Sequence, residues 1–306
     1  MRQTLDTTAE SGAAGDAANR QQAVGGRRRR LPVGRSVVVV IVALFVVWTL
    51  WPLYWMLSTS LKSGQEATNL NPTLWPHTIT GSNYGELFSS SLPFWNYFAN
   101  SILTSVIAAL VAVLISILAG YSFSRGGYRL GNASSVVVLA TQMLPLVVLI
   151  GPLYMLLLHA HLLNTYLGLI IGYTTFGIPF GAWMMKGFFD AIPREIEESA
   201  RVDGYSRLGI LFRVVVPLSV PGLVTTGVFV FMNTWNNLLY PLTLISTNTM
   251  QTLPSGLMQS FTGTFKTDWG GMMAASMITS IPLIVAFFLV QRSMVRGLTA
   301  GALAGT

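Results

Sequence analysis

The chain has 306 residues, of which 52% are hydrophobic and only 9% charged, whereas soluble domains carry about 25% charged residues. This composition excludes an ordinary soluble protein. The net charge of +7 and the pI near 9.9 are typical of nucleic-acid-binding proteins, but the mean hydropathy of +0.58 calls for another explanation of the 18 Lys and Arg residues. The absence of Cys excludes disulfides and thiolate chemistry.

Residues 1–35 are rich in Ala, Gly, Gln, Thr and Arg and have no apolar periodicity. We expect them to form a disordered, basic cytoplasmic tail, because such a composition buries too little apolar surface to fold. The arginines of this tail would fix the orientation of the chain and touch anionic membrane lipid.

Six apolar segments follow, and none of them contains Asp, Glu, Lys or Arg. They are residues 36–57, 99–123, 136–158, 166–185, 218–239 and 272–290. A helix needs about 20 apolar residues to cross a hydrocarbon core of about 30 Å. The first segment follows basic residues, as a signal sequence does, but it is too long for one and carries interfacial aromatic residues, so we interpret it as a retained span. We therefore expect an all-α membrane protein with six transmembrane helices over residues 36–290 and a cytoplasmic tail at 291–306.

The basic residues lie almost entirely on one side of these six spans. Sixteen of the 18 Lys and Arg residues fall on the side of the two termini, and only Lys62 and Lys266 fall on the other. Positive charge accumulates on the cytoplasmic side of membrane proteins. The sequence therefore predicts that both termini are cytoplasmic, and the basic balance gives no reason to expect a nucleic-acid partner.

The chain has few groups for chemistry of its own. The absence of charge in the spans disfavours a proton- or ion-coupled carrier, because such carriers need ionisable groups within the bilayer. No Lys follows a Gly, so a phosphate-binding loop is excluded. Two of the three His residues, His159 and His161, would point to different faces of a helix, and we predict no metal site.

The fifth apolar segment carries the most selective group of polar residues. Amide and aromatic side chains supply donors, acceptors and a stacking face for a polyhydroxylated ligand, although they suit hydrogen bonds between helices equally well. The candidates for the substrate pathway are Asn233, Trp235, Asn236, Asn237 and Tyr240.

The connection at residues 186–217, between the fourth and fifth spans, is densely charged but neutral overall. Pro193 suits the first position of a short helix, and Gly204 suits a left-handed residue that ends it. Ile196 and Ala200 would share one face of this helix. A second helix is expected over 206–216, with Pro217 at its junction with the fifth span. These features describe either a rigid cytoplasmic projection or a solvated amphipathic loop.

A motif in this connection resembles that of a known family. Glu198-Ser199-Ala200 is followed after three residues by Gly204, and after nine more by Val-Val-Val-Pro217. This spacing resembles the Glu-Ala-Ala motif of permease subunits of binding-protein-dependent ABC importers, with Ser199 in place of the commoner Ala. In that family the motif forms a coupling helix that docks on a cytoplasmic ATPase. The resemblance implies that role for Glu198, Ser199, Ala200, Asp203, Gly204 and Pro217.

Three further stretches resemble the carbohydrate branch of this family, in its maltose-type second permease. They are Trp235-Asn236 with Tyr240-Pro241-Leu242, the stretch Thr252-Leu253-Pro254-Ser255-Gly256-Leu257, and the tail with Gln291-Arg292 and Gly297-Leu298-Thr299-Ala300-Gly301-Ala302. In relatives this tail reaches toward the ATPases. The residues expected to contact the ATPases there are Gln291, Arg292, Gly297, Leu298 and Thr299. Ala304 stands where such tails usually carry Lys.

The resemblance implies one half of a sugar pathway that works by alternating access in the bacterial cytoplasmic membrane. The expected partners are a second homologous permease, two cytoplasmic ATPases that bind ATP and Mg²⁺, and an extracellular or periplasmic sugar-binding protein. This chain itself would bind no cofactor and catalyse no reaction. The alternatives are an importer permease for a peptide, an amino acid or a glycerophosphate, a secondary carrier or channel, and a non-transporting scaffold.

Overall fold

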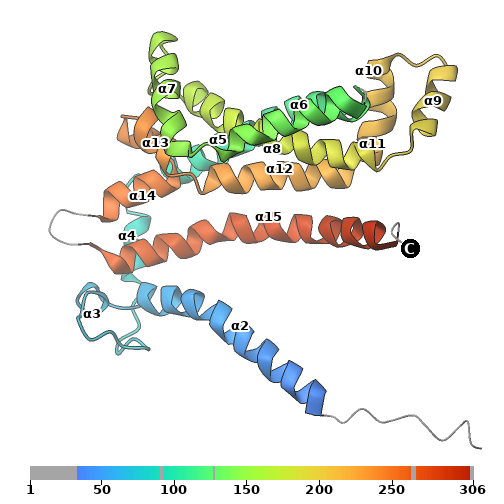
Figure 1. Ribbon diagram of the computed structural model, residues 1–306. Coiled ribbons are helices and arrows are strands. Elements are labelled where there is room, and N and C mark those ends of the chain that lie inside the picture. The colour runs from blue at the N-terminus through green and yellow to red at the C-terminus, as the bar shows by residue number, and fades with distance from the viewer. Residues whose placement is uncertain (1–32, 90–91, 127, 263–266, 304–306) are drawn as a thin grey trace, which may run out of the picture. The chain divides into compact units, whose positions relative to one another are not determined.

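The computed structural model describes residues 33–89, 92–126, 128–262 and 267–303, and most of these residues are helical (Figure 1). Within these ranges, the β-structure is limited to one isolated bridge between Thr262 and Thr267. The chain divides into two compact units after Tyr54. The all-α class predicted from the sequence is confirmed.

The elements follow one another closely along the chain. The first half contains α2 (Val33–Ser60), α3 (Gly64–Ala67), α4 (Ser82–Leu87), α5 (Phe94–Arg125), α6 (Tyr128–Ala140), the 3₁₀ turn η1 (Thr141–Met143) and α7 (Leu146–His159). The second half contains α8 (Tyr166–Asp190), α9 (Arg194–Val202), α10 (Arg207–Ile210), the π-helical η2 (Leu211–Val215), α11 (Val216–Leu218), α12 (Val220–Trp235), α13 (Leu239–Leu244), η3 (Asn248–Met250), α14 (Leu253–Phe261) and α15 (Trp269–Leu303).

Four of the described helices are each long and apolar enough to cross a membrane: Ser36–Ser60, Phe94–Arg125, Tyr166–Asp190 and Trp269–Gln291. Two further candidates are bent pairs of helices. Gly131–Met143 and Leu146–His159 meet at 96°, and Arg207–Leu218 and Val220–Trp235 meet at 81°. The predicted count of six spans is reached only when each bent pair is counted as one span.

The predicted third span, 136–158, is not one continuous helix. The chain leaves the helical conformation at Leu144 and Pro145, which both have extended ψ angles, before α7 begins. Proline has no N–H group, and it disfavours the helical conformation in the residue before it. Pro145 therefore separates two helices, whereas Pro152 is accommodated inside α7.

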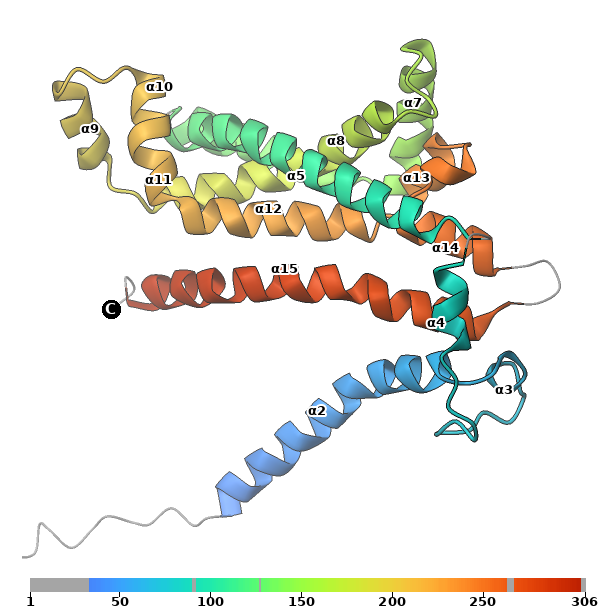
Figure 2. The ribbon, with the colours of Figure 1, turned by 180° about the vertical axis from the view of Figure 1, so that it is seen from behind.

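Helices α5 and α8 pack closely along one another, and α12 packs against both (Figure 2). The close approach depends on small residues. A Cβ atom on Gly120 of α5 would lie 2.8 Å from the Met185 Cβ and 2.9 Å from the Ala182 carbonyl oxygen of α8. Small residues let helices in membranes approach to this degree. The resulting framework of α5, α8 and α12 supports both regions described below.

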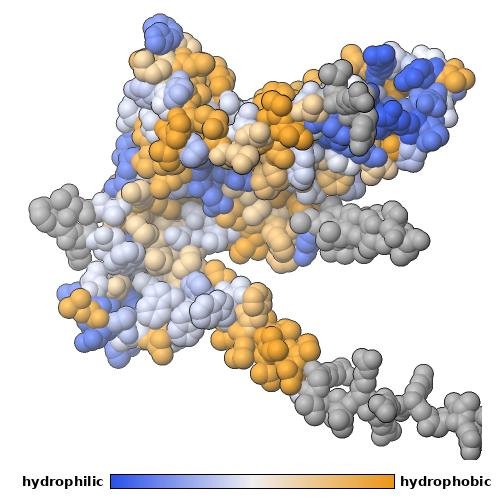
Figure 3. All heavy atoms as spheres, in the orientation of Figure 1, coloured by the Kyte–Doolittle hydropathy of each residue, from blue (hydrophilic) through white to orange (hydrophobic). Residues whose placement is uncertain are grey.

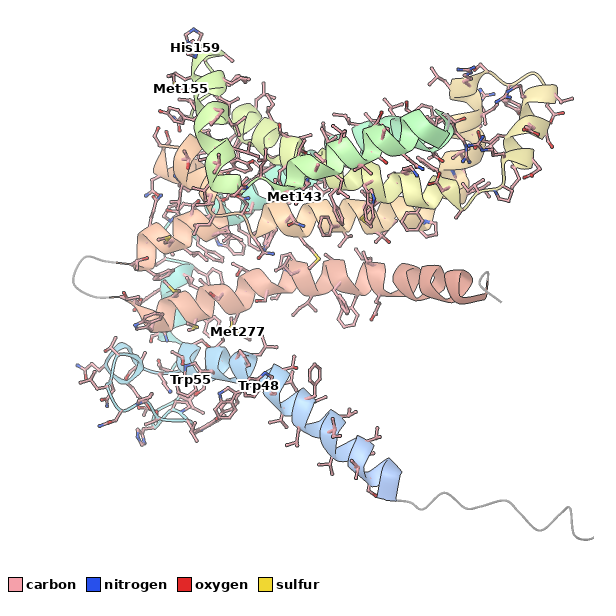
Figure 4. All side chains as sticks on the ribbon, in the orientation of Figure 1. Trp48, Trp55, Met143, Met155, His159 and Met277 are labelled. Atoms are coloured by element: carbon pink, nitrogen blue, oxygen red, sulfur yellow. The ribbon has the colours of Figure 1, made fainter. Side chains whose placement is uncertain are left out.

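The exposed surface differs between parts of the chain. Large hydrophobic side chains are exposed along α2, α6 and α7, while the end formed by α9 and α10 is hydrophilic (Figure 3). Trp48 and Trp55 project from α2, and His159 lies at the tip of α7 (Figure 4). The apolar surfaces suit contact with lipid or with other membrane helices.

Candidate coupling helix and substrate cavity

The predicted short helix in the connection between α8 and α12 is present as α9. Pro193 precedes it at the N-cap position, with ψ at 137°, so the expectation that Pro193 is the first helical residue is wrong by one position. Glu195 and Glu197 occupy the first turn, where the helix dipole favours negative charge.

Gly204 ends α9 in the left-handed conformation, with φ at +87°, as the sequence predicts. The amide of Gly204 donates to the Arg201 carbonyl, and the amide of Tyr205 donates to the Ala200 carbonyl, both at 3.1 Å. These two bonds form a Schellman motif, which satisfies carbonyl groups at the end of a helix. The end of α9 is therefore fixed at one residue.

One face of α9 is buried against the rest of the protein. Ala200 is buried against α8 and η2, whereas Ile196, one turn earlier, is 40% exposed. The second buried residue of this face is the charged Glu197, at 4% exposure. Helical spacing places both Ile196 and Glu197 one turn before Ala200, so either could share its buried face. Glu197 is the buried one because its partners lie on α5.

The opposite side of α9 is open to solvent. We define the candidate docking surface as Glu198, Ser199, Val202, Asp203 and Gly204, all of which are exposed. Val202 is exposed by 88%. Of the residues that the motif singles out, Ala200 therefore packs inside the protein, whereas Glu198, Ser199, Asp203 and Gly204 face outward. This surface combines the carboxylates of Glu198 and Asp203 with the exposed apolar side chain of Val202.

Glu197 makes an ion pair that sequence reasoning missed. Its Oε1 accepts from the Arg125 Nε at 2.7 Å and lies 2.6 Å from the Arg125 Nη2. Its Oε2 accepts from the Tyr121 hydroxyl at 2.8 Å. Both carboxylate oxygens are thus satisfied by residues at the end of α5. Glu197 and Arg125 are 72 residues apart in the sequence, so no local spacing signals the pair.

The second predicted helix, 206–216, begins where the sequence predicts, but it is not α-helical throughout. Ser206 caps α10 by accepting from the Gly209 amide at 3.2 Å, and residues 211–215 then form a π-helical turn. Pro217 lies inside α11 rather than at the junction, which falls at Ser219. Because proline removes one helical hydrogen bond, the wider turn before Pro217 accommodates it.

A cavity of about 230 Å³ lies among η1, α8, α12 and α13. Its polar side chains include Gln142, Asn233 and Asn237. Phe180 and Phe229 stack at 4.0 Å between ring centroids and form part of the apolar wall. Its other lining residues are Tyr173, Phe176, Gly177, Val230, Thr234 and Tyr240. Amide and aromatic side chains thus line the same cavity, which is partly open.

The five candidates for the substrate pathway are divided between two sides of α12. Asn233, Asn237 and Tyr240 line this cavity. Trp235 is buried, donates to the Thr279 carbonyl at 3.3 Å, and lines a separate hollow with Asn236 toward α14 and α15. Asn233 and Trp235 are two residues apart within α12, about 200° around its axis, so they lie on different sides of it. Asn236, the C-cap of α12, lies on the side of Trp235.

The remaining predicted sites lie on α15 or have no described structure. Gln291 is partly exposed near the end of the apolar part of α15. The backbone from Arg292 to Leu303 continues this helix, but the side chains of Arg292, Leu298 and Thr299 lie outside the described residues, as do residues 1–32. Among the described residues, no group of three His, Cys, Asp or Glu side chains is placed to hold a metal ion.

The segment after α2 is ordered by polar contacts. The Lys62 ammonium donates to the Thr73 carbonyl and lies 4.9 Å from the centroid of the Trp55 ring. The Glu66 carboxylate accepts from the Thr73 hydroxyl at 2.7 Å and from the His77 amide at 3.1 Å. These hydrogen bonds, that of Thr73 above all, lower the pKa of Glu66 below its usual value.

Comparison with known proteins identifies the family of the chain. The family described as "Binding-protein-dependent transport system inner membrane component" matches residues 112–300. The chain belongs to this family. It is 38% identical over 264 residues to the inner membrane ABC transporter permease protein YcjP of Escherichia coli, covering 86% of this chain and 94% of YcjP. It is 32% identical over 274 residues to the trehalose/maltose transport system permease protein MalG of Thermococcus litoralis, covering 89% of this chain and 97% of MalG.

The fold agrees with this membership. The chain is similar to a subunit in the crystal structure of a bacterial ABC transporter involved in the import of the acidic polysaccharide alginate, with a TM-score of 0.72, 23% identity, and coverage of 87% of this chain and 98% of that subunit. The chain is therefore a multi-pass membrane permease subunit of the ABC importer family. ATP hydrolysis in such importers is carried out by separate subunits, so this chain is not itself an enzyme.

Proposed function

We propose that this chain forms half of the translocation pathway of an ATP-driven importer for a neutral sugar. The observation that carries the proposal is the cavity that Asn233 and Asn237 line together with the stacked rings of Phe180 and Phe229. Amide groups exchange hydrogen bonds with hydroxyls, and aromatic faces pack on the apolar faces of sugar rings. The MalG relative, which belongs to a trehalose/maltose system, supports the same substrate class.

The charges of the chain support a neutral substrate. The predicted spans contain no Asp, Glu, Lys or Arg, and the lining of the cavity is uncharged. A charged solute would have no counter-charge there, and burying an unpaired charge is costly. A peptide, amino-acid or glycerophosphate importer is therefore the second choice.

Membership of the family supports a particular assembly. The chain would pair with a homologous permease, receive its solute from an extracellular or periplasmic sugar-binding protein, and dock on two cytoplasmic ATPases that bind ATP and Mg²⁺. The excess of Lys and Arg supports cytoplasmic termini in a bacterial membrane, with residues 1–35 as a basic tail and residues 291–306 extending toward the ATPases. The segment held by Lys62 and Glu66 then faces the binding protein.

Coupling would run through α9. A helix whose exposed side docks on an ATPase transmits work only if it binds the two states of that ATPase with different free energy. The docking surface offers Glu198 and Asp203 for charged partners and Val202 for an apolar pocket. Alternating access would follow as the ATPases close and carry α9 with them.

The amides of the cavity give a specific prediction. Replacing both Asn233 and Asn237 by alanine should lower the rate of uptake by about tenfold, because two hydrogen-bonding groups at about 1.4 kcal/mol in total are lost from the pathway. ATP hydrolysis without the binding protein should not change. The matched control is Thr225→Val on α12, which removes a polar group outside this cavity. Equal rates of uptake for both variants would contradict the role of the cavity.

The function itself is tested in liposomes that contain this chain, its partner permease and the ATPases, with the binding protein outside. Radiolabelled maltose and trehalose are the first probes, and radiolabelled glutamate and a radiolabelled dipeptide are the charged probes. We expect sugar uptake that requires both internal ATP and the binding protein. Uptake that persists without ATP would indicate a secondary carrier, and uptake of the charged probes alone would indicate the alternative substrate class.

A further inference from the structure

The ion pair between Arg125 and Glu197 joins more than two residues. The Nη2 of Arg125 also donates to the carbonyls of Phe189 at 3.0 Å and Ile192 at 3.2 Å, at the end of α8. Its Nη1 donates to the Ser124 hydroxyl at 2.8 Å. One guanidinium on α5 therefore holds the end of α8 and the first turn of α9 together. Arginine suits this position because its planar group offers five donors in fixed directions.

A second chain of contacts links the same helix ends. The Ser124 hydroxyl donates to the Asp190 carboxylate, which also accepts from the Lys186 ammonium one turn earlier in α8. The Arg194 side chain donates to the Ser124 carbonyl at 3.4 Å. The ends of α5, α8 and α9 are thus connected by charged and polar groups in addition to apolar packing.

Glu197 differs from its neighbour Glu198 in what it can contact. The side chain of Glu197 is 5% exposed and its two oxygens have three donors within the same chain. Glu198 is exposed and belongs to the docking surface. A carboxylate that is buried and fully hydrogen-bonded inside the permease has no free oxygen for a partner subunit. Glu197 therefore acts on α9 itself.

We propose that Glu197 and Arg125 are positioning residues that clamp the coupling helix to the ends of α5 and α8, so that these three elements move as one body. The proposal rests on the function proposed above. Removing one partner of a buried ion pair leaves the other charge unpaired, which destabilises that arrangement strongly. Without the clamp, α9 can shift relative to α5 and α8 while it remains docked on the ATPase. The movement of the ATPase on closure is then not transmitted to α5 and α8.

The test uses the complete assembly in liposomes and measures the ratio of ATP hydrolysis with maltose-loaded binding protein to hydrolysis without it. We expect Glu197→Gln and Arg125→Gln to lower this stimulation ratio about fivefold or more, within the usual range of coupling between sites, while hydrolysis without binding protein is retained. Arg125→Lys keeps the charge but cannot serve all the acceptors, and should give an intermediate ratio. Arg213→Gln is the matched control, because it removes an exposed cytoplasmic charge that is not part of the clamp.

A second measurement separates positioning from general damage. Amide hydrogen exchange over residues 194–202 in the assembly should become faster in Glu197→Gln and stay unchanged in Arg213→Gln. A merely structural defect would lower both hydrolysis rates in proportion and leave their ratio unchanged, which would overturn the proposal. A parent-like ratio and parent-like exchange in Glu197→Gln would overturn it as well. Failure of the proposed function is distinguishable, because the parent assembly would then show no stimulation.

Discussion

Replacing Gly204 by valine is expected to reduce ATP-driven sugar uptake at least about tenfold while the chain still inserts into the membrane. Gly204 has φ at +87°, and a residue with a Cβ atom pays about 1–2 kcal/mol in this region, with a β-branched residue worse placed than alanine. The two hydrogen bonds that end α9 depend on this conformation. The docking surface next to Gly204 would change shape without any change in the spans.

A graded series at this position identifies the cause. No heavy atom lies within 4 Å of a Cβ added at Gly204, so the effect of a substitution comes from the backbone and not from crowding. Gly204→Asn should keep most of the uptake, because asparagine tolerates the left-handed region, and Gly204→Ala should fall between Asn and Val. Uptake, ATP hydrolysis and co-purification of the ATPases are measured together. An asparagine variant as defective as the valine variant would point to loss of the glycine surface itself.

The left-handed end of α9 shows what the sequence can reveal about this region. A proline before the helix and a glycine after it are local signals, because each acts through the conformation of its own residue. The ends of α9 therefore agree with prediction to within one position. Glu197 carries no such signal: its importance comes from Arg125 and Tyr121, which reach it only when α5 packs beside α8.

The polar residues near the end of α12 illustrate a second limit. Helical spacing places both Asn236 and Asn237 one turn from Asn233, and the sequence cannot choose between them. In the structure Asn236 is the C-cap of α12 and lines the hollow with Trp235, whereas Asn237 follows the cap and lines the cavity with Asn233. The break at Pro145 is a different case. Proline itself predicts the end of a helix, but the continuous apolar run around it predicts one uninterrupted span.

Replacing Gly120 by leucine is expected to destabilise the permease strongly. The added side chain would meet the Met185 Cβ at 2.8 Å, and the Ala182 carbonyl oxygen and the Lys186 amide nitrogen at 2.9 and 3.0 Å. Two of these atoms belong to the backbone of α8, so no side-chain rotation relieves the contact. Overpacking of this kind costs about 1–3 kcal/mol or more. The melting temperature of the purified assembly and its yield should both fall.

Gly187→Leu on α8 is the matched control. It adds the same side chain to a helical glycine of α8, two residues beyond Met185, but no heavy atom lies within 4 Å of a Cβ there. It should leave the melting temperature within a few degrees of the parent value, because surface substitutions change stability by about 0.5 kcal/mol or less. Equal destabilisation by both variants would mean that any leucine in place of a helical glycine destabilises the protein, and that the packing of α5 on α8 is not the cause. A loss confined to Gly120→Leu would instead assign the stability of the framework, on which both the cavity and the clamp depend, to that single close approach.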